Sequence, residues 1–380
     1  MLLAILAAIS LVIWIYILFG RGAFWRISRA ILPIADAAPP ARNIVAIVPA
    51  RNEAETIARA VRSLLDQSIP LNVIVVDDSS IDSTAEIARA AAAAIHSSHR
   101  FTAIQAKPLI SGWTGKLWAL SQGLSHALTE RPDYVLFTDA DIVHERDSVR
   151  HLLAISEKKS CDLTSLMVKL TCDSLAERAL IPAFVFFFLK LYPPAWIANA
   201  KAKTAGAAGG CMLIKPAALA RIGGLAAIRH QVIDDCSLAR AIKRSGGTIW
   251  MGLTNETRSI RPYGSSAEIG RMIARSAFSQ LRHSFWLLLA TVVALLLIYV
   301  IPVVALCAGN RTAALAGVTA WLAMTICYWP TVRFYRLAWA WAVCLPFIAL
   351  FYLGATVYSA LLYWNGRGGG WKGRTQDVRN

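Results

Sequence analysis

Long apolar runs occupy both ends of the chain, and a region with a different pattern lies between them. The N-terminal run covers residues 1–19 and is followed by Arg21, Arg26 and Arg29. A cleaved signal peptide would carry its charge before the apolar run and a small-residue cleavage site after it. The reversed order predicts an uncleaved membrane anchor over residues 1–20, with the arginines in the cytoplasm and the N-terminus outside.

Three further apolar runs near the C-terminus lie at residues 285–308, 312–329 and 337–364. Each can cross about 30 Å of hydrocarbon, so we predict about three transmembrane segments over residues 285–364. Four crossings in total would place the basic tail, residues 365–380, outside, although basic segments normally stay in the cytoplasm. Either that rule fails here or one run does not cross, for example through a re-entrant hairpin broken at Pro346.

A fifth apolar run, residues 181–197, lies inside the central region and reads IPAFVFFFLKLYPPAWI. Lys190 and the pair Pro193–Pro194 interrupt it. We expect a helix at the membrane interface rather than a crossing. A helix buried in the protein core is the open alternative.

Short β-branched runs alternate with amphipathic segments between residues 43 and 284, after a basic, Pro- and Ala-rich linker over residues 21–42. Strands are predicted at residues 43–48, 72–76, 101–106 and 134–138, and helices at 52–67, 82–95 and 116–128. This alternation is typical of an α/β, Rossmann-like, mostly parallel sheet with helices on both faces. Ligands bind such sheets at the carboxyl ends of the strands.

Composition supports a membrane protein and argues against two other classes. Hydrophobic residues make up 56% of the 380 residues, above the roughly 45–50% of soluble domains. The net charge is +16, but the basic residues flank apolar runs and no nucleic-acid motif occurs, so we expect no nucleic-acid partner. The seven cysteines form no Cys-x-x-Cys pair, which indicates reduced thiols rather than a zinc site.

Three acidic pairs stand where a parallel sheet would bind its ligand. Asp77 and Asp78 follow one predicted strand, Asp139-Ala140-Asp141 follows another, and Asp234-Asp235 precedes a helix. Any one of these pairs has a simple structural explanation, such as capping a turn. The three together, in this order, favour chemistry on a sugar nucleotide.

That chemistry requires carboxylates in two different roles. The leaving diphosphate gains charge in the transition state, and a divalent ion neutralises it. Mg²⁺ or Mn²⁺ binds through one or two carboxylates and phosphate oxygens, which suits Asp-x-Asp at a strand end. A separate carboxylate must accept the proton of the attacking hydroxyl.

The chain resembles the family 2 glycosyltransferases, which have the GT-A fold, over about residues 43–284. The motifs are VPARNEAETI at 48–57, VVDDSS at 75–80, GWTGK at 112–116, DAD at 139–141 and DD at 234–235. Within this family it is most similar to the bacterial hopene-associated glycosyltransferase group. That likeness rests on FVFFFLKLYPPAW, on RSAFSQLRHS at 275–284 and on GGGWKGR at 368–374. Carotenoid-ester glycosyltransferases with a comparable tail are more distantly similar.

The resemblance implies a role for each matching residue. Asp235 would be the catalytic base of an inverting displacement, with Asp234 beside it. Asp141 would ligate the metal, and Asp139 would contact the metal or the ribose. The residues implied to bind the nucleotide-sugar are Pro49, Glu53, Asp77, Asp78, Lys116, Asp139, Gln280 and Arg282.

Two departures from the family pattern refine this expectation. Asp234 stands where the acidic pair usually begins with Glu. Processive polysaccharide synthases carry Gln-x-x-Arg-Trp, whereas Gln280 to Ser284 here contain no Arg in register and no Trp, which favours transfer of a single sugar. Gln280 and Arg282 either face the diphosphate or acceptor, or form the polar face of an amphipathic helix.

We therefore expect a multi-pass protein of the bacterial inner membrane that transfers one sugar from a UDP-sugar to a lipid. The resemblance implies a hopanoid or related polyprenoid acceptor and a catalytic domain facing the cytoplasm. A nucleotidylyltransferase is disfavoured because the first strand lacks a Gly-rich loop after it. A non-catalytic scaffold is disfavoured because all three acidic sites are intact, and a polysaccharide synthase because its Trp is missing. The sequence assigns neither a particular sugar nor an oligomeric state.

Overall fold

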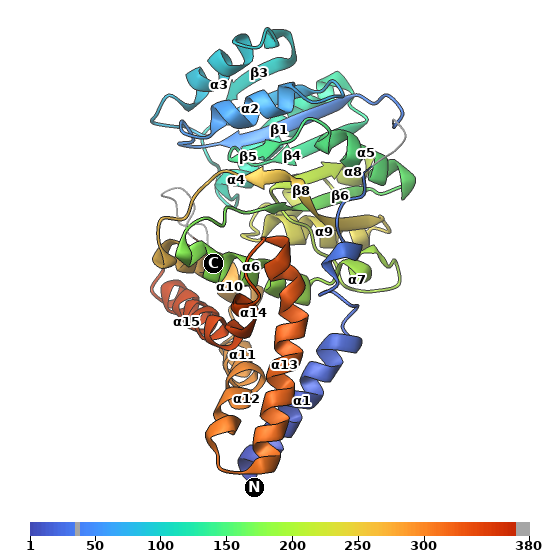
Figure 1. Ribbon diagram of the computed structural model, residues 1–380. Coiled ribbons are helices and arrows are strands. Elements are labelled where there is room, and N and C mark those ends of the chain that lie inside the picture. The colour runs from blue at the N-terminus through green and yellow to red at the C-terminus, as the bar shows by residue number, and fades with distance from the viewer. Residues whose placement is uncertain (35–38, 370–380) are drawn as a thin grey trace.

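In the computed structural model, an α/β body stands on a group of long apolar helices (Figure 1). The structure describes residues 1–34 and 39–369. Residues 35–38 of the predicted linker, most of the GGGWKGR motif and the rest of the basic tail lie outside the described residues.

The body is built on one eight-stranded sheet with the strand order β3-β2-β1-β4-β7-β6-β8-β5. The strands are β1 (Ile44–Ala50), β2 (Asn72–Asp77), β3 (Phe101–Gln105), β4 (Tyr134–Thr138), β5 (Ile142–His144), β6 (Leu163–Lys169), β7 (Cys211–Ile214) and β8 (Ile249–Ser259). The first four are parallel, as predicted. Strand β7 is antiparallel to β4 and β6, and β5 is antiparallel to β8. The second half of the sheet is therefore mixed. After β6 the chain passes through apolar helices and re-enters the sheet at β7, between β4 and β6, in the opposite direction.

Helices cover both faces of the sheet. They are α2 (Ile57–Leu65), α3 (Thr84–Ala93), α4 (Gly115–Ala127), α5 (Ser148–Lys158), α8 (Pro216–Arg221) and α9 (Asp234–Arg244). Buried residues of α2, α3 and α5 form one core, and those of α4, α8 and α9 belong to the other. Along β1, Val45 and Ile47 face the second core while Ile44, Ala46 and Val48 face the first, so the strand is apolar on both sides, as a buried parallel strand requires.

The apolar runs form the second part of the molecule. Its helices are α1 (Leu2–Phe19), α6 (Leu175–Leu191), α7 (Pro194–Ala198), α10 (Ser266–Gln280), α11 (Phe285–Leu295), the π-helical turn η5 (Leu296–Val300), α12 (Ile301–Val304), η6 (Ala305–Cys307), α13 (Arg311–Phe334), α14 (Ala340–Val343) and α15 (Leu345–Trp364). Five stretches among the described residues are long and apolar enough to cross a membrane: Leu2–Phe19, Leu175–Ala198, Phe285–Cys307, Arg311–Phe334 and Leu345–Trp364.

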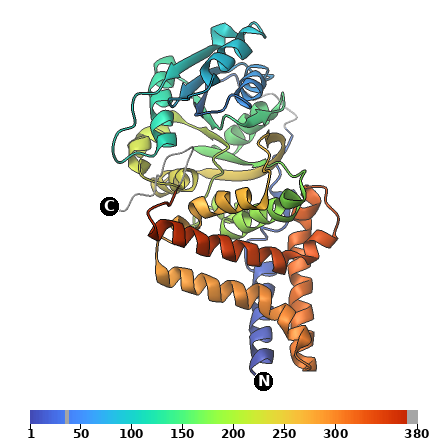
Figure 2. The same cartoon turned by 90° about the vertical axis from the view of Figure 1, so that its left-hand side faces the viewer.

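These helices run in two directions. Helices α1 and α13 lie side by side and point away from the body, and α12 descends with them, whereas α11 and α15 run crosswise (Figures 1 and 2). Helices α6 and α10 pack between α15 and the sheet, and Ile181, Phe186 and Leu189 of α6 are fully buried. This is the core arrangement left open for residues 181–197. Pro346 lies in the first turn of α15, which tolerates proline, and the helix continues unbroken to Trp364, so no re-entrant hairpin forms there.

Helix α1 forms hydrogen bonds to a bend in the apolar stretch Phe285–Cys307. Pro302 has no N–H to donate to the carbonyl of Ile298, and the π-helical turn η5 lies at the same place. The Ile298 carbonyl instead accepts hydrogen bonds from Ser10 Oγ at 3.2 Å and Trp14 Nε1 at 3.0 Å. Helix α1 thus satisfies a backbone group that the bend leaves without a partner.

Candidate active site

The acidic side chains predicted from the sequence gather at one edge of the sheet. Asp77 is the last residue of β2, Asp139 follows β4 directly, and Glu53 lies in the turn after β1. Because these strands are parallel, their carboxyl ends share that edge. The helix predicted over residues 52–67 starts only at Ile57, because Asn52 has a φ of 51° and the chain turns there, which places Glu53 at the sheet edge.

Arg261, just beyond β8, links two of the predicted residues. Its Nη2 donates to both carboxylate oxygens of Glu53 at 2.6 Å, and its Nε donates to Oδ2 of Asp141 at 2.9 Å. Burial and the nearby Asp139 carboxylate raise the pKa of Asp141, and Arg261 opposes that rise. The pair of carboxylates therefore already binds a positive charge.

Lys116, in the first turn of α4, joins the other carboxylates. Its Nζ lies 2.8 Å from Asp139 Oδ1 and 3.6 Å from Asp234 Oδ2. Burial alone would lower the pKa of Lys116, but Asp139, Asp234 and Asp235 outweigh it and raise the pKa above its ordinary value. Lys116 is therefore a fixed cation between the Asp-x-Asp motif and the pair on α9.

Asp235, in the first turn of α9, is held by backbone groups. Its Oδ2 accepts a hydrogen bond from Gly209 N at 2.8 Å, and its Oδ1 accepts one from Cys236 N at 2.6 Å. Burial, and then the Asp234 charge, raise the pKa of Asp235 to about 6, against the opposing effect of these backbone groups and Lys116. A carboxylate with a pKa near the working pH suits a general base.

The remaining predicted nucleotide-binding residues lie around β1 and β2. Asp77 Oδ1 accepts hydrogen bonds from the backbone N–H of Ser80 at 3.2 Å and from the Ser80 hydroxyl. Asp78 is buried, and Arg51 donates to its carbonyl oxygen at 2.5 Å. Pro49 lies inside β1 opposite Val76 and is buried in the sheet.

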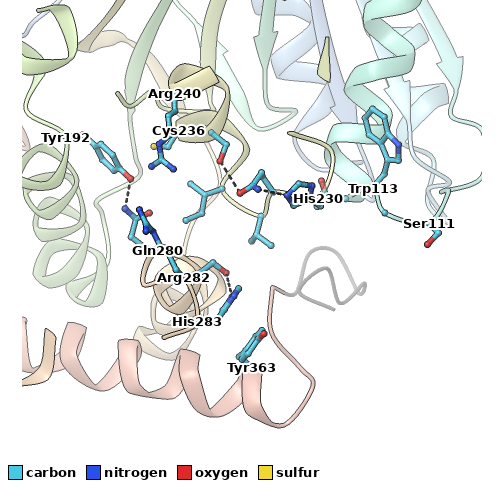
Figure 3. A pocket seen from close by; sticks show the side chains of 17 residues that line it. Ser111, Trp113, Tyr192, His230, Cys236, Arg240, Gln280, Arg282, His283 and Tyr363 are labelled. Atoms are coloured by element: carbon cyan, nitrogen blue, oxygen red, sulfur yellow. Dashed lines mark hydrogen bonds between the residues drawn. The ribbon is translucent and has the colours of Figure 1, made fainter. Parts of the chain in front are cut away.

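Gln280 and Arg282 lie elsewhere, in a pocket of about 790 Å³ between α9, the end of α10 and Tyr363 of α15 (Figure 3). Gln280 Nε2 donates to Tyr192 Oη at 2.5 Å. Ile233 and Cys236, on either side of Asp235 in the sequence, also line this pocket. We call it the α9–α10 pocket. The structure thus places these two residues on the Asp235 side of the site, away from Glu53, Asp77 and Asp78.

Two cation-binding oxygen donors are available at the Asp-x-Asp motif. Asp139 and Asp141 both have a cationic side chain beside them, which shows that their oxygens suit positive charge. Within residues 1–34 and 39–369, no group of three His, Cys, Asp or Glu side chains could hold a metal alone. A metal here would take its other ligands from a diphosphate and from water, as Mg²⁺ commonly does.

Arg261 and Gly209 were not predicted as members of this cluster, and Gly209 is 26 residues from Asp235 in the sequence. Arg261 follows β8, so it obeys the rule that residues after strands carry the chemistry. The sequence of β8, IWMGLTNETRS, has a polar second half, so its pattern does not indicate a strand that ends at Ser259.

Comparison with known proteins bears on the family and the fold. Residues 45–223 match the model of the family described as Glycosyl transferase family 2. Two 4,4'-diaponeurosporenoate glycosyltransferases of Staphylococcus aureus, from strains bovine RF122 / ET3-1 and USA300, are 36% and 37% identical over 114 residues. Each alignment covers 30% of this chain and 28% of the relative, so the match spans less than a third of those proteins.

A solved mannosyltransferase from Pyrobaculum calidifontis, in complex with GDP-Man and Mn²⁺, has a similar fold. The TM-score is 0.58 at 21% identity, over 93% of this chain and 99% of that one. The shared fold therefore extends beyond the sheet into the apolar helices. The family match includes Glu53, Lys116 and Asp141 but ends before Asp234 and Asp235. The predicted GT-A fold is confirmed, and residues 45–223 are similar to glycosyl transferase family 2.

Proposed function

We propose that the protein is a membrane-bound, inverting glycosyltransferase that transfers a single sugar from a UDP-sugar to a lipid. The observation that carries this proposal is the position of Lys116. Its Nζ contacts Asp139 of the Asp-x-Asp motif and lies 3.6 Å from Asp234, the neighbour of Asp235. One site therefore contains both the carboxylates suited to a donor diphosphate and a separate carboxylate suited to act as base.

The donor would lie along the strand ends. Glu53, Asp77 and Asp78 would surround the uridine, Pro49 would support that edge from within β1, and Asp139 and Asp141 would hold the metal. A bound Mg²⁺ or Mn²⁺ would neutralise charge on the leaving diphosphate. The Pyrobaculum mannosyltransferase, solved with GDP-Man and Mn²⁺, supports this donor class at the level of a nucleotide-sugar.

Asp235 would accept the proton of the acceptor hydroxyl as that oxygen attacks the anomeric carbon. The hydrogen bonds from Gly209 N and Cys236 N fix the orientation of its carboxylate. Attack from the face opposite the diphosphate inverts the configuration at that carbon. The missing Gln-x-x-Arg-Trp motif supports a single transfer rather than a growing polymer.

The directions of the helices suggest how the protein lies in a membrane. We propose three crossings: α1, the descending segment from η5 to η6 into which the crosswise α11 leads, and α13 (Figure 2). Helix α15 would lie along the cytoplasmic surface. An odd number of crossings puts the N-terminus outside and both the body and the basic tail in the cytoplasm, which resolves the conflict raised by four crossings.

The site would then face the surface of the bacterial inner membrane, where a lipid acceptor can reach it. The name of the Staphylococcus relatives gives 4,4'-diaponeurosporenoate as their substrate, and the hopene-associated resemblance suggests a hopanoid or related polyprenoid. Both favour an acceptor that is dissolved in the bilayer.

The test is release of UDP from a panel of UDP-sugars by the purified full chain in lipid nanodiscs with Mg²⁺ or Mn²⁺. We expect release that requires a bacterial lipid extract and metal, and that is lost in Asp235→Asn. The exposed Asp66, at the end of α2, provides the matched control Asp66→Asn, which should retain activity. Bound UDP without turnover of any UDP-sugar would support the scaffold alternative instead.

A further inference from the structure

The charged side chains that line the α9–α10 pocket are two arginines, and two histidines lie beside them. Arg240 comes from α9, His230 from the loop before it, and Arg282 and His283 from the end of α10 (Figure 3). No Asp or Glu is among the described residues that line this pocket. The pocket therefore differs from the carboxylate cluster next to it, where acidic and basic groups alternate.

The two arginines of the pocket are not neutralised by the protein. Neither guanidinium makes a hydrogen bond or an ion pair with another residue of the described chain, whereas Lys116 and Arg261 are both paired with carboxylates. Guanidinium groups bind carboxylates and phosphates through paired N–H donors. An anionic ligand would supply the partner that these two side chains lack.

The end of α10 is fixed in an uncommon conformation. Arg282 and His283 both have a φ of 53°, in the left-handed region that few non-glycine residues adopt. The backbone N–H of His283 donates to Phe278 O at 3.1 Å, its Nε2 lies 3.0 Å from Ser279 Oγ, and its ring stacks on Tyr363 with centroids 4.0 Å apart. Such conformations persist where surrounding contacts impose them, often at ligand sites. Here they hold Arg282 at the pocket wall.

Apolar side chains continue from the pocket onto the outer helices. Phe285 and Trp286 follow the Arg282–His283 turn and are 54% and 74% exposed, and Trp364 follows Tyr363 and is 39% exposed. Phe285 and Trp364 lie together, with ring centroids 6.5 Å apart. A ligand suited to both surfaces has a charged head and an apolar tail.

We propose that the α9–α10 pocket binds the acceptor lipid through an anionic group, a phosphate or a carboxylate, held by Arg240 and Arg282. The hydroxyl that receives the sugar is a separate group of the same lipid. The apolar tail extends over Phe285, Trp286 and Trp364 into the bilayer. The inference rests on the proposed function, because the pocket is an acceptor site only if Asp235 serves the transfer. Ile233 and Cys236 of the pocket wall lie within two residues of Asp235 in the sequence, so the pocket adjoins the turn that carries the proposed base.

The test is isothermal titration of the full chain in phosphatidylcholine nanodiscs at pH 8 with three probes: dodecyl phosphate, dodecanoate and dodecanol. We expect one or both anions to bind and the neutral alcohol to bind at least about tenfold more weakly. Binding of only the phosphate or only the carboxylate identifies the head group. Equal binding of dodecanol would overturn the proposal.

Variants separate the arginines from general effects of charge at the membrane. Arg240→Gln and Arg282→Gln should each weaken the anion by roughly tenfold or more, as expected for loss of a charged hydrogen bond. Arg282→Lys should retain most of the affinity. Arg271→Gln is the matched control, because Arg271 is an exposed arginine of α10 that does not line the pocket. Anion binding at wild-type strength in both Gln variants would refute the assignment.

UDP with Mn²⁺ is titrated into the same samples to separate this inference from the proposed function. Unchanged UDP binding shows that a variant is folded. If Arg282→Gln loses UDP binding, the anion affinity of Arg240→Gln decides whether the pocket binds the anion. Failure of the wild type to bind UDP would contradict the proposed function, whatever the anion results. If the wild type binds UDP but binds dodecanol as tightly as the two anionic probes, only the acceptor inference is contradicted.

Discussion

The pKa of Asp235 leads to a specific dependence of transfer on pH. The group acts as base only when deprotonated, so the rate should fall as the pH drops through about 6, the pKa to which burial and Asp234 raise this carboxyl. With that pKa, the deprotonated fraction falls from about 91% at pH 7 to about 9% at pH 5, so the rate falls roughly tenfold. With an unshifted pKa of 3.8, the rate would change by less than about 10% over the same range.

The measurement is kcat/KM for UDP release in nanodiscs between pH 4.5 and 8.5 at constant ionic strength, because kcat/KM reports groups of the free enzyme. Asp234→Asn should shift the acidic limb to lower pH, since removing a neighbouring negative charge lowers the pKa of Asp235. A flat profile between pH 5 and 7, or a limb that moves to higher pH in Asp234→Asn, would refute the reasoning.

Three further changes test the rest of the site. Arg261→Gln leaves Glu53 and Asp141 without their cation, and we expect the unfolding free energy to fall by about 1–2 kcal/mol, a modest loss because the guanidinium is partly exposed. Electron paramagnetic resonance should show tighter Mn²⁺ binding in this variant. Unchanged Mn²⁺ affinity would count against a metal at Asp141. Asp141→Asn should weaken Mn²⁺ binding and reduce UDP release by about a hundredfold or more, and activity near wild type would remove this residue from the metal site. Gly209→Ala would place a Cβ 3.2 Å from Asp235 Oδ2. We expect kcat to fall by about tenfold because the base is displaced, while UDP binding and the melting temperature stay unchanged. A lower melting temperature would instead assign Gly209 a structural role.

The first half of the sheet was predictable because its strands are short, apolar and followed by acidic residues. The run Val73–Val76 is buried on both faces, and Asp77 follows it at the ligand-binding edge. The second half was not predicted in detail for two physical reasons. Strand β5 has only three residues, and β8 ends in the polar residues TNETRS, of which Asn255 and Arg258 are exposed. Arg261 was missed with β8.

The directions of the apolar helices were the least predictable feature, because length and hydropathy do not fix direction. Helix α15 has 20 residues and the composition of a crossing helix, but its polar groups bind neighbours that hold it crosswise. Tyr352 Oη donates to Leu180 O of α6 at 2.8 Å, and Ser359 Oγ accepts from Phe278 N of α10 at 3.0 Å. Only the tertiary structure shows these partners.

The hydrogen bonds from α1 to the Ile298 carbonyl have a consequence for how the protein is made. Trp14 and Ile298 are 284 residues apart, so in the proposed topology α1 would enter the membrane long before its partner is synthesised. Until then the indole N–H of Trp14 and the hydroxyl of Ser10 have no native acceptor in the lipid, and later the bent helix depends on them. Deleting residues 1–19 would therefore expose a backbone carbonyl inside the hydrocarbon, and the shortened chain should misassemble in the membrane rather than yield a free catalytic body.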